Sequence, residues 1–479
     1  MSPRFLVSGA VVLALGLAPL ASDRVSGQTT RFESPGGVVE TCVVLDPMPG
    51  AVYTDADHDA ERELCAVDLY DPQVAICPKL VSTSPGTFIY GLDAGAYAGA
   101  PERFESEVCP RGEVVVEEAD GPPVYFKVTM NGQETSATFS TASLLYYHFS
   151  RFLNGTVRVP VSVYRSIDRG VHEQRVTRRG LDLSANRSAL RMNHAAWQEL
   201  DAVEKGSEQY VSPDEIFTAD RKRVHGVLLR VSGRRYGPEF NGTRRSGWGD
   251  GQNQDFQQTA AYLALRHDAP LAAAIDHGLR SARRDDELDR ALGATVSATQ
   301  MAFWMQDLTE IVFLDYLFSQ QDRIGNIDYV DTWHWVHDGV LHTRAARGSV
   351  PPPDIAGSAP VLLRRTWLND NDAGGKRMYR NYAKRTGMIE GLRHFNPDTY
   401  RRLIGLAADL AAGGEIHSYV RDTFGLTQQQ LDQIVTNAGL AAATLQAACR
   451  AAQLRFDLDP VGVLTAGAAS VSSVDCDVQ

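Results

Sequence analysis

The chain has 479 residues, of which 43% are hydrophobic and 22% are charged, a composition typical of globular proteins with a large core. Its formal net charge of −12 argues against a general nucleic-acid-binding function, which needs a basic surface, and gives no attraction to an anionic membrane. The length allows about three domains, or one large fold with additions.

The first predicted element is a secretory signal peptide over residues 1–27. Arg4 supplies a positive charge, the stretch from Phe5 to Leu20 is apolar, and small residues follow, with Ala21 and Gly27 as candidate cleavage positions. The apolar stretch is short for a membrane span and has no basic flank after it. We therefore expect an exported protein, periplasmic or extracellular, with no stable membrane span after cleavage. The alternative is an uncleaved N-terminal anchor.

Residues 28–112 are predicted to form a Cys-containing N-terminal extension of short strands and turns. The chain has six Cys, and an even number in an exported protein favours disulfides. No CxxC motif is present, which disfavours zinc and redox sites. We expect pairing within the first four Cys, with the connectivity open, and a bridge between the last two. The six are Cys42, Cys65, Cys77, Cys109, Cys449 and Cys476.

Residues 113–235 are predicted to form a β-rich lobe. EVVVEEADGPPVYFKVTMNG predicts two β-rich runs joined by a Gly-Pro-Pro turn, and TASLLYYHFSRFLN has the apolar spacing of a helix. Two further strands, VRVPVSVYRSI and VHGVLLRVSG, flank a helical insertion. Only six of the 47 Lys and Arg residues are Lys, which indicates a GC-rich, bacterial genome and draws attention to Lys127 in VYFKV.

Residues 236–460 are predicted to form a helical lobe, followed by a tail over 461–479. A long irregular segment is expected over roughly 331–360. Asn396 and Pro397 predict a helix start, and Thr427 and Gln430 predict a capping box. A β-rich lobe followed by a helical lobe favours a ligand site between them.

Four residues in chain order match the needs of phosphoryl transfer, which requires a cation on the phosphates, metal ligands and a carboxylate for the acceptor hydroxyl. Lys127 lies within a predicted strand. Asp322 and Asn326 follow a long apolar helix in SQQDRIGN, and Asp372 begins an Asp-x-Gly pattern in WLNDNDAGGK. Each also has an ordinary explanation: a lysine pointing to solvent, a polar loop after a buried helix, and turn residues.

Two weaker features complete the candidates. GLDAGAYAG, at 91–99, is a possible phosphate-binding loop, although a lone loop of this kind is a weak signal. His334, His337 and His342 are close enough in sequence for a metal site, but aromatic-rich segments with His more often pack in a core.

Lys127, YHFSRFL, QQDRIGN and NDNDAGG, in this order, resemble the atypical kinase superfamily. The pattern is most similar to secretory-pathway kinases of the Golgi casein kinase type and more distantly similar to phosphoinositide 4-kinases and HipA-type kinases. The resemblance implies a two-lobed α+β protein-kinase-like fold that uses ATP with Mg²⁺ or Mn²⁺. It implies Lys127 on the nucleotide phosphates, Asp322 as catalytic residue, and Asp372 and Asn326 on the metal, with Asp370 beside them.

The sequence departs from that pattern at several positions. Ser143 stands near the place of the helix Glu that would pair with Lys127, and Glu134 is the nearest carboxylate that would substitute at the nucleotide. Ile324 replaces a His, and Asn326 is one residue closer to Asp322 than usual. The sequence therefore predicts an exported kinase-like phosphotransferase that moves the ATP γ-phosphate to a protein, sugar or envelope acceptor. The alternative is a weakly active or inactive kinase-fold binding module.

Overall fold

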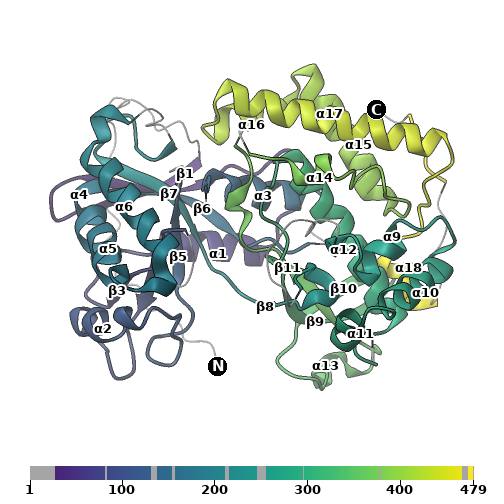
Figure 1. Cartoon of the computed structure of the whole chain (residues 1–479), viewed down its shortest axis with the longest axis horizontal. Coiled ribbons are helices and arrows are strands. Elements are labelled where there is room, and N and C mark those ends of the chain that lie inside the picture. The colour runs from purple at the N-terminus through teal and green to yellow at the C-terminus, as the bar shows by residue number, and fades with distance from the viewer. Residues whose placement is uncertain are drawn as a thin grey trace.

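The computed structural model describes residues 27–80, 84–130, 137–153, 157–210, 215–244, 255–294, 296–376, 379–466 and 473–477. In these residues the protein is a mixed α/β structure, with a seven-stranded sheet on one side and a helical part with a four-stranded sheet on the other (Figure 1). The predicted signal peptide falls outside the described residues except for Gly27.

The larger sheet is antiparallel and has the order β1-β2-β6-β7-β5-β4-β3. Its strands are β1 (Gly27–Glu33), β2 (Val39–Leu45), β3 (Val74–Pro78), β4 (Thr87–Gly91), β5 (Val124–Val128), β6 (Ser162–Asp168) and β7 (Arg223–Leu229). Strands from the Cys-containing extension thus continue the sheet formed by residues 124–229. The division into domains at residue 113 stays a prediction.

Of the two strands predicted around the Gly-Pro-Pro turn, the prediction of the first is wrong. VYFKV forms β5, but residues 113–119 form no strand. Val115 is buried whereas Val114 and Val116 are exposed. β4, the neighbour of β5, already pairs with β3 on its other side, so the sheet offers this run no free edge there. The later strands and the helix after Lys127 are confirmed as β6, β7 and α3 (Thr141–Phe152).

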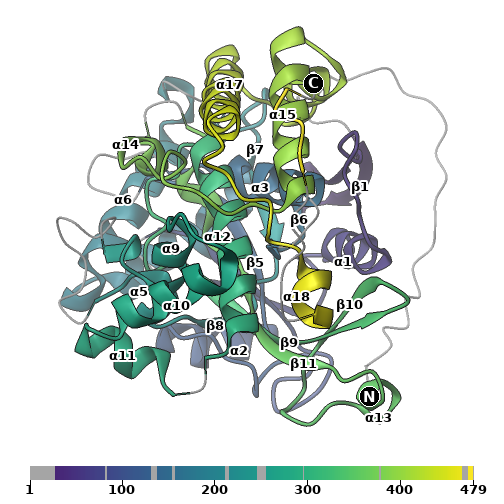
Figure 2. The same ribbon diagram turned by 90° about the vertical axis from the view of Figure 1, so that its right-hand side faces the viewer.

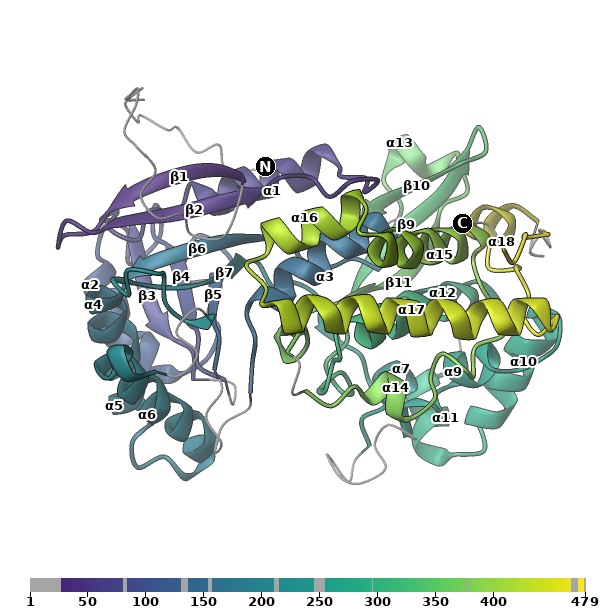
Figure 3. The ribbon, with the colours of Figure 1, turned by 90° about the horizontal axis from the view of Figure 1, so that it is seen from above.

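Helices cover the larger sheet at several places. They are α1 (Asp55–Cys65), α2 (Pro101–Glu107) with η1 (Cys109–Arg111), and the insertion between β6 and β7, which comprises α4 (Arg169–His172), η2 (Glu173–Thr177), α5 (Arg178–Ser184), η3 (Ser188–Leu190), α6 (Arg191–Lys205) and η4 (Ser207–Gln209). The insertion helices lie at the end of the molecule away from α10, whereas α3 lies between the sheet and the helical part (Figures 1 and 3).

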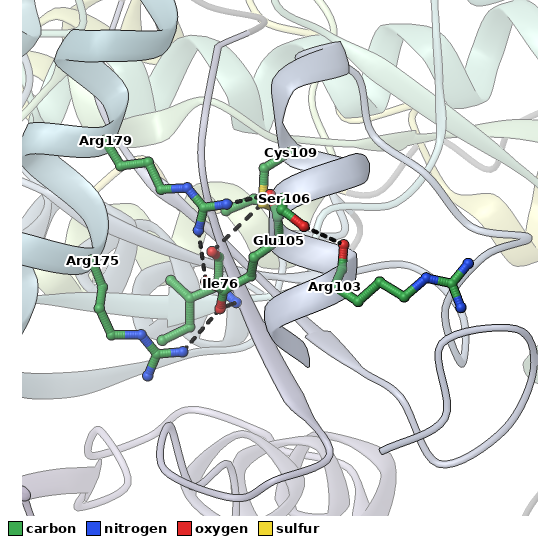
Figure 4. Close-up of a disulfide and its surroundings, with 8 residues drawn as sticks. Ile76, Arg103, Glu105, Ser106, Cys109, Arg175 and Arg179 are labelled. Atoms are coloured by element: carbon green, nitrogen blue, oxygen red, sulfur yellow. Dashed lines mark hydrogen bonds and ion pairs between the residues drawn. A yellow bond between two sulfur atoms is a disulfide. The ribbon is translucent and has the colours of Figure 1, made fainter. Parts of the chain in front are cut away.

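The disulfides expected from the six Cys are confirmed: Cys42–Cys65, Cys77–Cys109 and Cys449–Cys476. Cys77–Cys109 joins β3 to the end of α2, and Glu105 of α2 accepts hydrogen bonds from Ile76 N, Arg175 and Arg179 (Figure 4). The disulfide therefore holds β3 against the α2–η1 segment, and the ion pairs of Glu105 hold α2 against the insertion helices.

A long, almost completely buried helix, α12 (Ala298–Leu317), forms the centre of the helical part (Figure 2). Ser297 caps it, and its residues from Gln300 onward are buried against α3, α9, α17 and β11. The surrounding helices are α7 (Pro238–Asn241), α9 (Ala260–Leu265), α10 (Leu271–Ala282), α11 (Asp286–Leu292), α14 (Tyr382–Arg385), α15 (Pro397–Ala412), α16 (Glu415–Thr423), α17 (Gln428–Arg450) and α18 (Pro460–Ala466). Its buried carboxylates are paired, Asp307 with Arg365 and Asp315 with Arg323. A helix buried on all sides provides a rigid support for the loop after it.

The prediction of an irregular segment over 331–360 is wrong for its first half, which forms an antiparallel hairpin. The smaller sheet consists of β8 (Arg234–Arg235), β9 (Asp328–His337), β10 (Val340–Ala345) and β11 (Val361–Trp367), with α13 (Pro353–Ala356) between the last two. Asp338 and Gly339 have φ values of 50° and 74°, as a two-residue hairpin turn requires. The predicted strand before Asp370 is confirmed as β11.

Both predicted helix starts in the second half of the chain are confirmed. Asn396 accepts hydrogen bonds from the amides of Asp398 and Thr399, and Thr427 and Gln430 form a reciprocal capping box. Among the described helices, none combines the length and apolar character needed to cross a membrane.

Candidate functional site

Lys127 lies at the centre of the candidate site. β5, which carries it, is held between β4 and β7, so its backbone is fixed on both sides. Its side chain is 6% exposed, and Nζ lies 3.2 Å from Asp370 Oδ1 and 3.0 Å from Asp372 Oδ1. Burial alone would lower the pKa of the Lys127 ammonium, but the Asp372 and Asp370 carboxylates outweigh it and raise that pKa. Lys127 and Asp372, which the sequence suggested for one site, are therefore in direct contact.

Asp370 occupies a strained backbone position between β11 and the short helix η6 (Asn371–Ala373). Its φ and ψ are 52° and 48°, a left-handed conformation that costs a non-glycine residue roughly 1–2 kcal/mol. Partial desolvation by the surrounding protein would raise the pKa of the Asp370 carboxyl, but the nearby cations Lys127, Lys79 and Arg235 lower it instead. Strained residues persist where the surroundings hold them, often at functional sites.

Arg323 connects the loop after α12 to the Asp370 segment. Its Nε lies 3.0 Å from Asp315 Oδ2 in α12, Nη2 donates to Asn371 Oδ1 at 2.8 Å, and Nη1 donates to the Asn369 carbonyl oxygen at 3.1 Å. Tyr146 of α3 donates to the same Asp315 at 2.8 Å. One buried guanidinium thus fixes both residues that flank Asp370.

We expect Arg323→Ala to lower the free energy of unfolding by about 3–5 kcal/mol, because it leaves Asp315 as a buried charge without its partner. Arg280→Ala removes an exposed pair with Asp276 and should cost less than about 1 kcal/mol. Urea denaturation of the two variants checks this difference. Similar small losses in both would show that Arg323 does not hold the loop.

Asp322 and Asn326 lie in the same loop, on the solvent side of Arg323. The Asn326 side-chain amide donates to the Asp322 carbonyl oxygen at 2.8 Å, so the two residues stabilise one turn. Partial desolvation by the surrounding protein raises the pKa of the Asp322 carboxyl, and the Asp370 carboxylate raises it further. The Asp322 side chain itself keeps access to solvent.

Arg235 of β8 is a site residue that the sequence did not indicate. Its guanidinium donates to Asn326 Oδ1 at 2.6 Å and to the Gly325 carbonyl oxygen. It also lies 2.7 Å from Asp328 Oδ1 and 3.3 Å from Asp370 Oδ2. Two of the predicted metal ligands, Asn326 and Asp370, are therefore bridged by a cation of the chain itself. No sequence motif surrounds Arg235, and only the β8–β9 pairing brings it here.

Lys79 is a second missed residue, although the scarcity of lysine could have indicated it. It follows β3 directly, and its side chain is buried. Burial and the neighbouring Lys127 lower the pKa of the Lys79 ammonium, whereas Asp370 and Asp372 act in the opposite direction. Lys79 and Lys127 thus interact electrostatically with the same pair of carboxylates.

Other candidates do not join this cluster. Ser143 is buried in α3 and has no carboxylate to pair with Lys127, whose ion pairs are made with Asp370 and Asp372. Glu134 lies outside the described residues. The loop 91–99 begins at the far end of β4, about 13 Å along the strand from Thr87, the residue nearest Lys127. Its role as a phosphate loop at this site is therefore wrong.

The three histidines of the β9–β10 hairpin do not converge on a metal site, and His337 is largely exposed. His334 is buried against Phe303, and burial lowers its pKa to about 2. His342 stacks on Trp335. The described residues contain no ready-made cluster of three or more His, Cys, Asp or Glu side chains suited to a metal ion.

No known protein family and no curated protein matches the sequence. Among solved structures, the chain is similar to one described as "crystal structure of the Golgi casein kinase with Mn/ADP bound". The identity is 11% and the TM-score 0.41, with 83% of this chain and 77% of that chain covered. A likeness at this level assigns the chain to no family, so the roles of the site residues rest on the geometry.

Proposed function

We propose that the protein is an exported, kinase-like phosphotransferase with a two-lobed arrangement, which uses ATP and Mg²⁺ or Mn²⁺. The observation that carries this proposal is the buried Lys127 held between Asp370 and Asp372, next to the loop of Asp322. A cation for phosphates, carboxylates for a metal and a separate carboxylate for the acceptor are the parts that phosphoryl transfer requires. The three disulfides are consistent with export into an oxidising compartment.

The donor atoms at the site fit a hard divalent cation. Asp370, Asp372 and Asn326 offer only oxygen ligands, which Mg²⁺ and Mn²⁺ prefer. We propose that these three residues hold the metal, which would neutralise charge on the transferred phosphoryl group. Because Arg235 donates to Asn326 Oδ1, its guanidinium has to withdraw before a metal binds to that atom.

The chain's own residues divide the remaining tasks. Lys127 would bind nucleotide phosphate oxygens when the carboxylates turn to the metal. Asp322 would orient the acceptor hydroxyl and accept its proton, a task for which a raised carboxyl pKa is favourable. Acceptors with a hydroxyl group, such as a protein side chain, a sugar or an envelope component, fit this chemistry.

A second candidate is a nucleotide-binding module without transfer activity. Two observations favour it: Ser143 stands where a helix carboxylate would hold Lys127, and Arg235 occupies Asn326 Oδ1. In this case the site would bind nucleotide and metal, and Asp322 would have no catalytic role.

Calorimetric titration with a non-hydrolysable ATP analogue and Mn²⁺, followed by an assay of γ-phosphate transfer, tests both candidates. At a ligand concentration of 100 times the dissociation constant, binding should stabilise the protein by about 2.7 kcal/mol. Binding with transfer to an acceptor mixture or to the protein itself supports the kinase. Binding without any transfer favours the second candidate, and no binding with either metal contradicts both.

A further inference from the structure

Lys79 occupies a fixed position at the edge of the candidate site. Its amide donates to the Gly86 carbonyl oxygen at 2.8 Å, and its carbonyl oxygen accepts from Asn193 Nδ2 of α6 at 3.2 Å. Cys77, two residues earlier, is bound to Cys109. Because the backbone is held on all these sides, the direction of the Lys79 side chain is set by the fold.

The strand register places Lys79 beside Lys127. Pro78 pairs with Thr87, and Thr87 pairs with Phe126 of β5. A Cβ added at Gly86 would lie 3.5 Å from Lys79 Cδ and 3.3 Å from the Phe126 carbonyl oxygen. The aliphatic part of Lys79 therefore lies against Gly86, at the level of the strand that carries Lys127.

The Lys79 side chain is largely buried, and its ammonium has no partner among the described residues. The side chain is 8% exposed, and among the described residues its Nζ makes no hydrogen bond or ion pair. The nearby carboxylate oxygens Asp370 Oδ1 and Asp372 Oδ1 already pair with Lys127. A cation on a largely buried side chain loses much of its contact with water, so an anion from outside the chain is expected to bind it.

We propose that Lys79 is a second phosphate-binding lysine, which makes the site selective for nucleoside di- and triphosphates over monophosphates. The proposal rests on the proposed function, because it assumes that Lys127 binds nucleotide phosphates. Two nearby ammonium groups repel each other unless several negative charges lie between them, and a chain of phosphates supplies these charges. A single phosphate can satisfy Lys127 but leaves Lys79 unpaired.

Lys79→Met tests this proposal, since it keeps the length of the side chain and removes its charge. We expect the affinity for ADP and for a non-hydrolysable ATP analogue, each with Mn²⁺, to fall at least about tenfold, or about 1.4 kcal/mol. AMP and adenosine should bind with little change. The melting temperature of the ligand-free variant should rise, because an uncompensated buried charge is removed.

Two further variants separate charge from structure. Lys79→Arg keeps a cation and should preserve part of the preference for ADP over AMP. Lys205→Met removes an exposed lysine that pairs with Asp201 and should change neither affinity nor stability.

The results distinguish this inference from the proposed function. If the wild-type protein binds no adenine nucleotide, the proposed function fails and this inference fails with it. If the wild-type protein binds ADP and Lys79→Met binds it equally well, only the role of Lys79 is overturned. A Lys79→Met protein that unfolds, or that loses affinity for AMP and ADP alike, also overturns it, because Lys79 would then be structural.

Discussion

Asp322→Asn is expected to reduce phosphate transfer by roughly 10²–10⁴-fold, the range typical for the loss of a general base. Nucleotide affinity should stay nearly unchanged, since the Asp322 side chain contacts neither Lys127 nor Asp372 among the described hydrogen bonds and ion pairs. Asn keeps the shape of the side chain, so the turn shared with Asn326 remains. Calorimetric titration and single-turnover transfer, measured on the same preparation, separate the two effects.

The pH dependence gives a second readout for Asp322. Its carboxyl has to be ionised to accept a proton, and its pKa is raised above the ordinary value of about 3.9. Transfer by the wild-type protein should therefore fall as the pH decreases through this raised pKa, and the residual rate of Asp322→Asn should lack that acidic limb.

The ionised Asp322 carboxylate is expected to lower the free energy of unfolding, whereas a carboxylate in an ion pair usually raises it. A carboxyl whose pKa is raised on folding binds its proton more tightly in the folded state, so its ionised form lowers stability above that pKa. Asp322→Asn should therefore be at least as stable as the wild-type protein at neutral pH. A marked loss of stability would assign Asp322 to the structure of the loop, and nucleotide binding that falls together with transfer would remove its separate role.

Local patterns in the sequence predicted much of the secondary structure. The strand of Lys127, helix α3 and the capped starts of α15 and α17 follow from features within a few residues of each other. The β9–β10 hairpin had such a signal too, in Asp338-Gly339 between two strands, but the aromatic and His residues around it obscured the strand pattern.

The composition of the site was less predictable because it depends on contacts between distant segments. Lys127 and Asp372 are 245 residues apart, and only the expected order of functional residues suggested that they meet. Lys79 and Arg235 have no motif around them. The register of β3, β4 and β5 brings Lys79 to the site, and the pairing of β8 with β9 brings Arg235 there.

The surroundings of Asp370 and Asp372 indicate a different principal metal ligand from the one that the Asp-x-Gly pattern indicates. The pattern indicates Asp372 as the principal metal ligand. However, the Asp372 side chain is 9% exposed and pairs with Lys127, whereas the Asp370 side chain is 36% exposed. Asp370 also lies next to Arg235 and has a strained backbone. An accessible carboxylate is better placed to share a metal with a phosphate, so we expect Asp370 to be the principal ligand. Asp372 would then contribute less to the metal and more to holding Lys127.

We therefore expect Asp370→Asn to abolish the part of nucleotide affinity that depends on Mn²⁺, leaving weak, metal-independent binding. Asn tolerates a left-handed backbone, so this substitution should not disturb the turn. Asp372→Asn should instead weaken nucleotide binding both with and without Mn²⁺, because Lys127 loses its closest partner and is no longer held in place.

Titration of an ATP analogue in the presence of Mn²⁺ or a chelator measures both components, and Asp331→Asn, outside this cluster and paired with Arg234, is the matched control. The reverse pattern, with metal dependence lost only in Asp372→Asn, would restore Asp372 as the principal ligand. Equal loss of the metal-dependent component in both variants would mean that the two carboxylates share one ion. In that case Lys127 would be released when the metal binds, and its ammonium would become available for the phosphates in the same step.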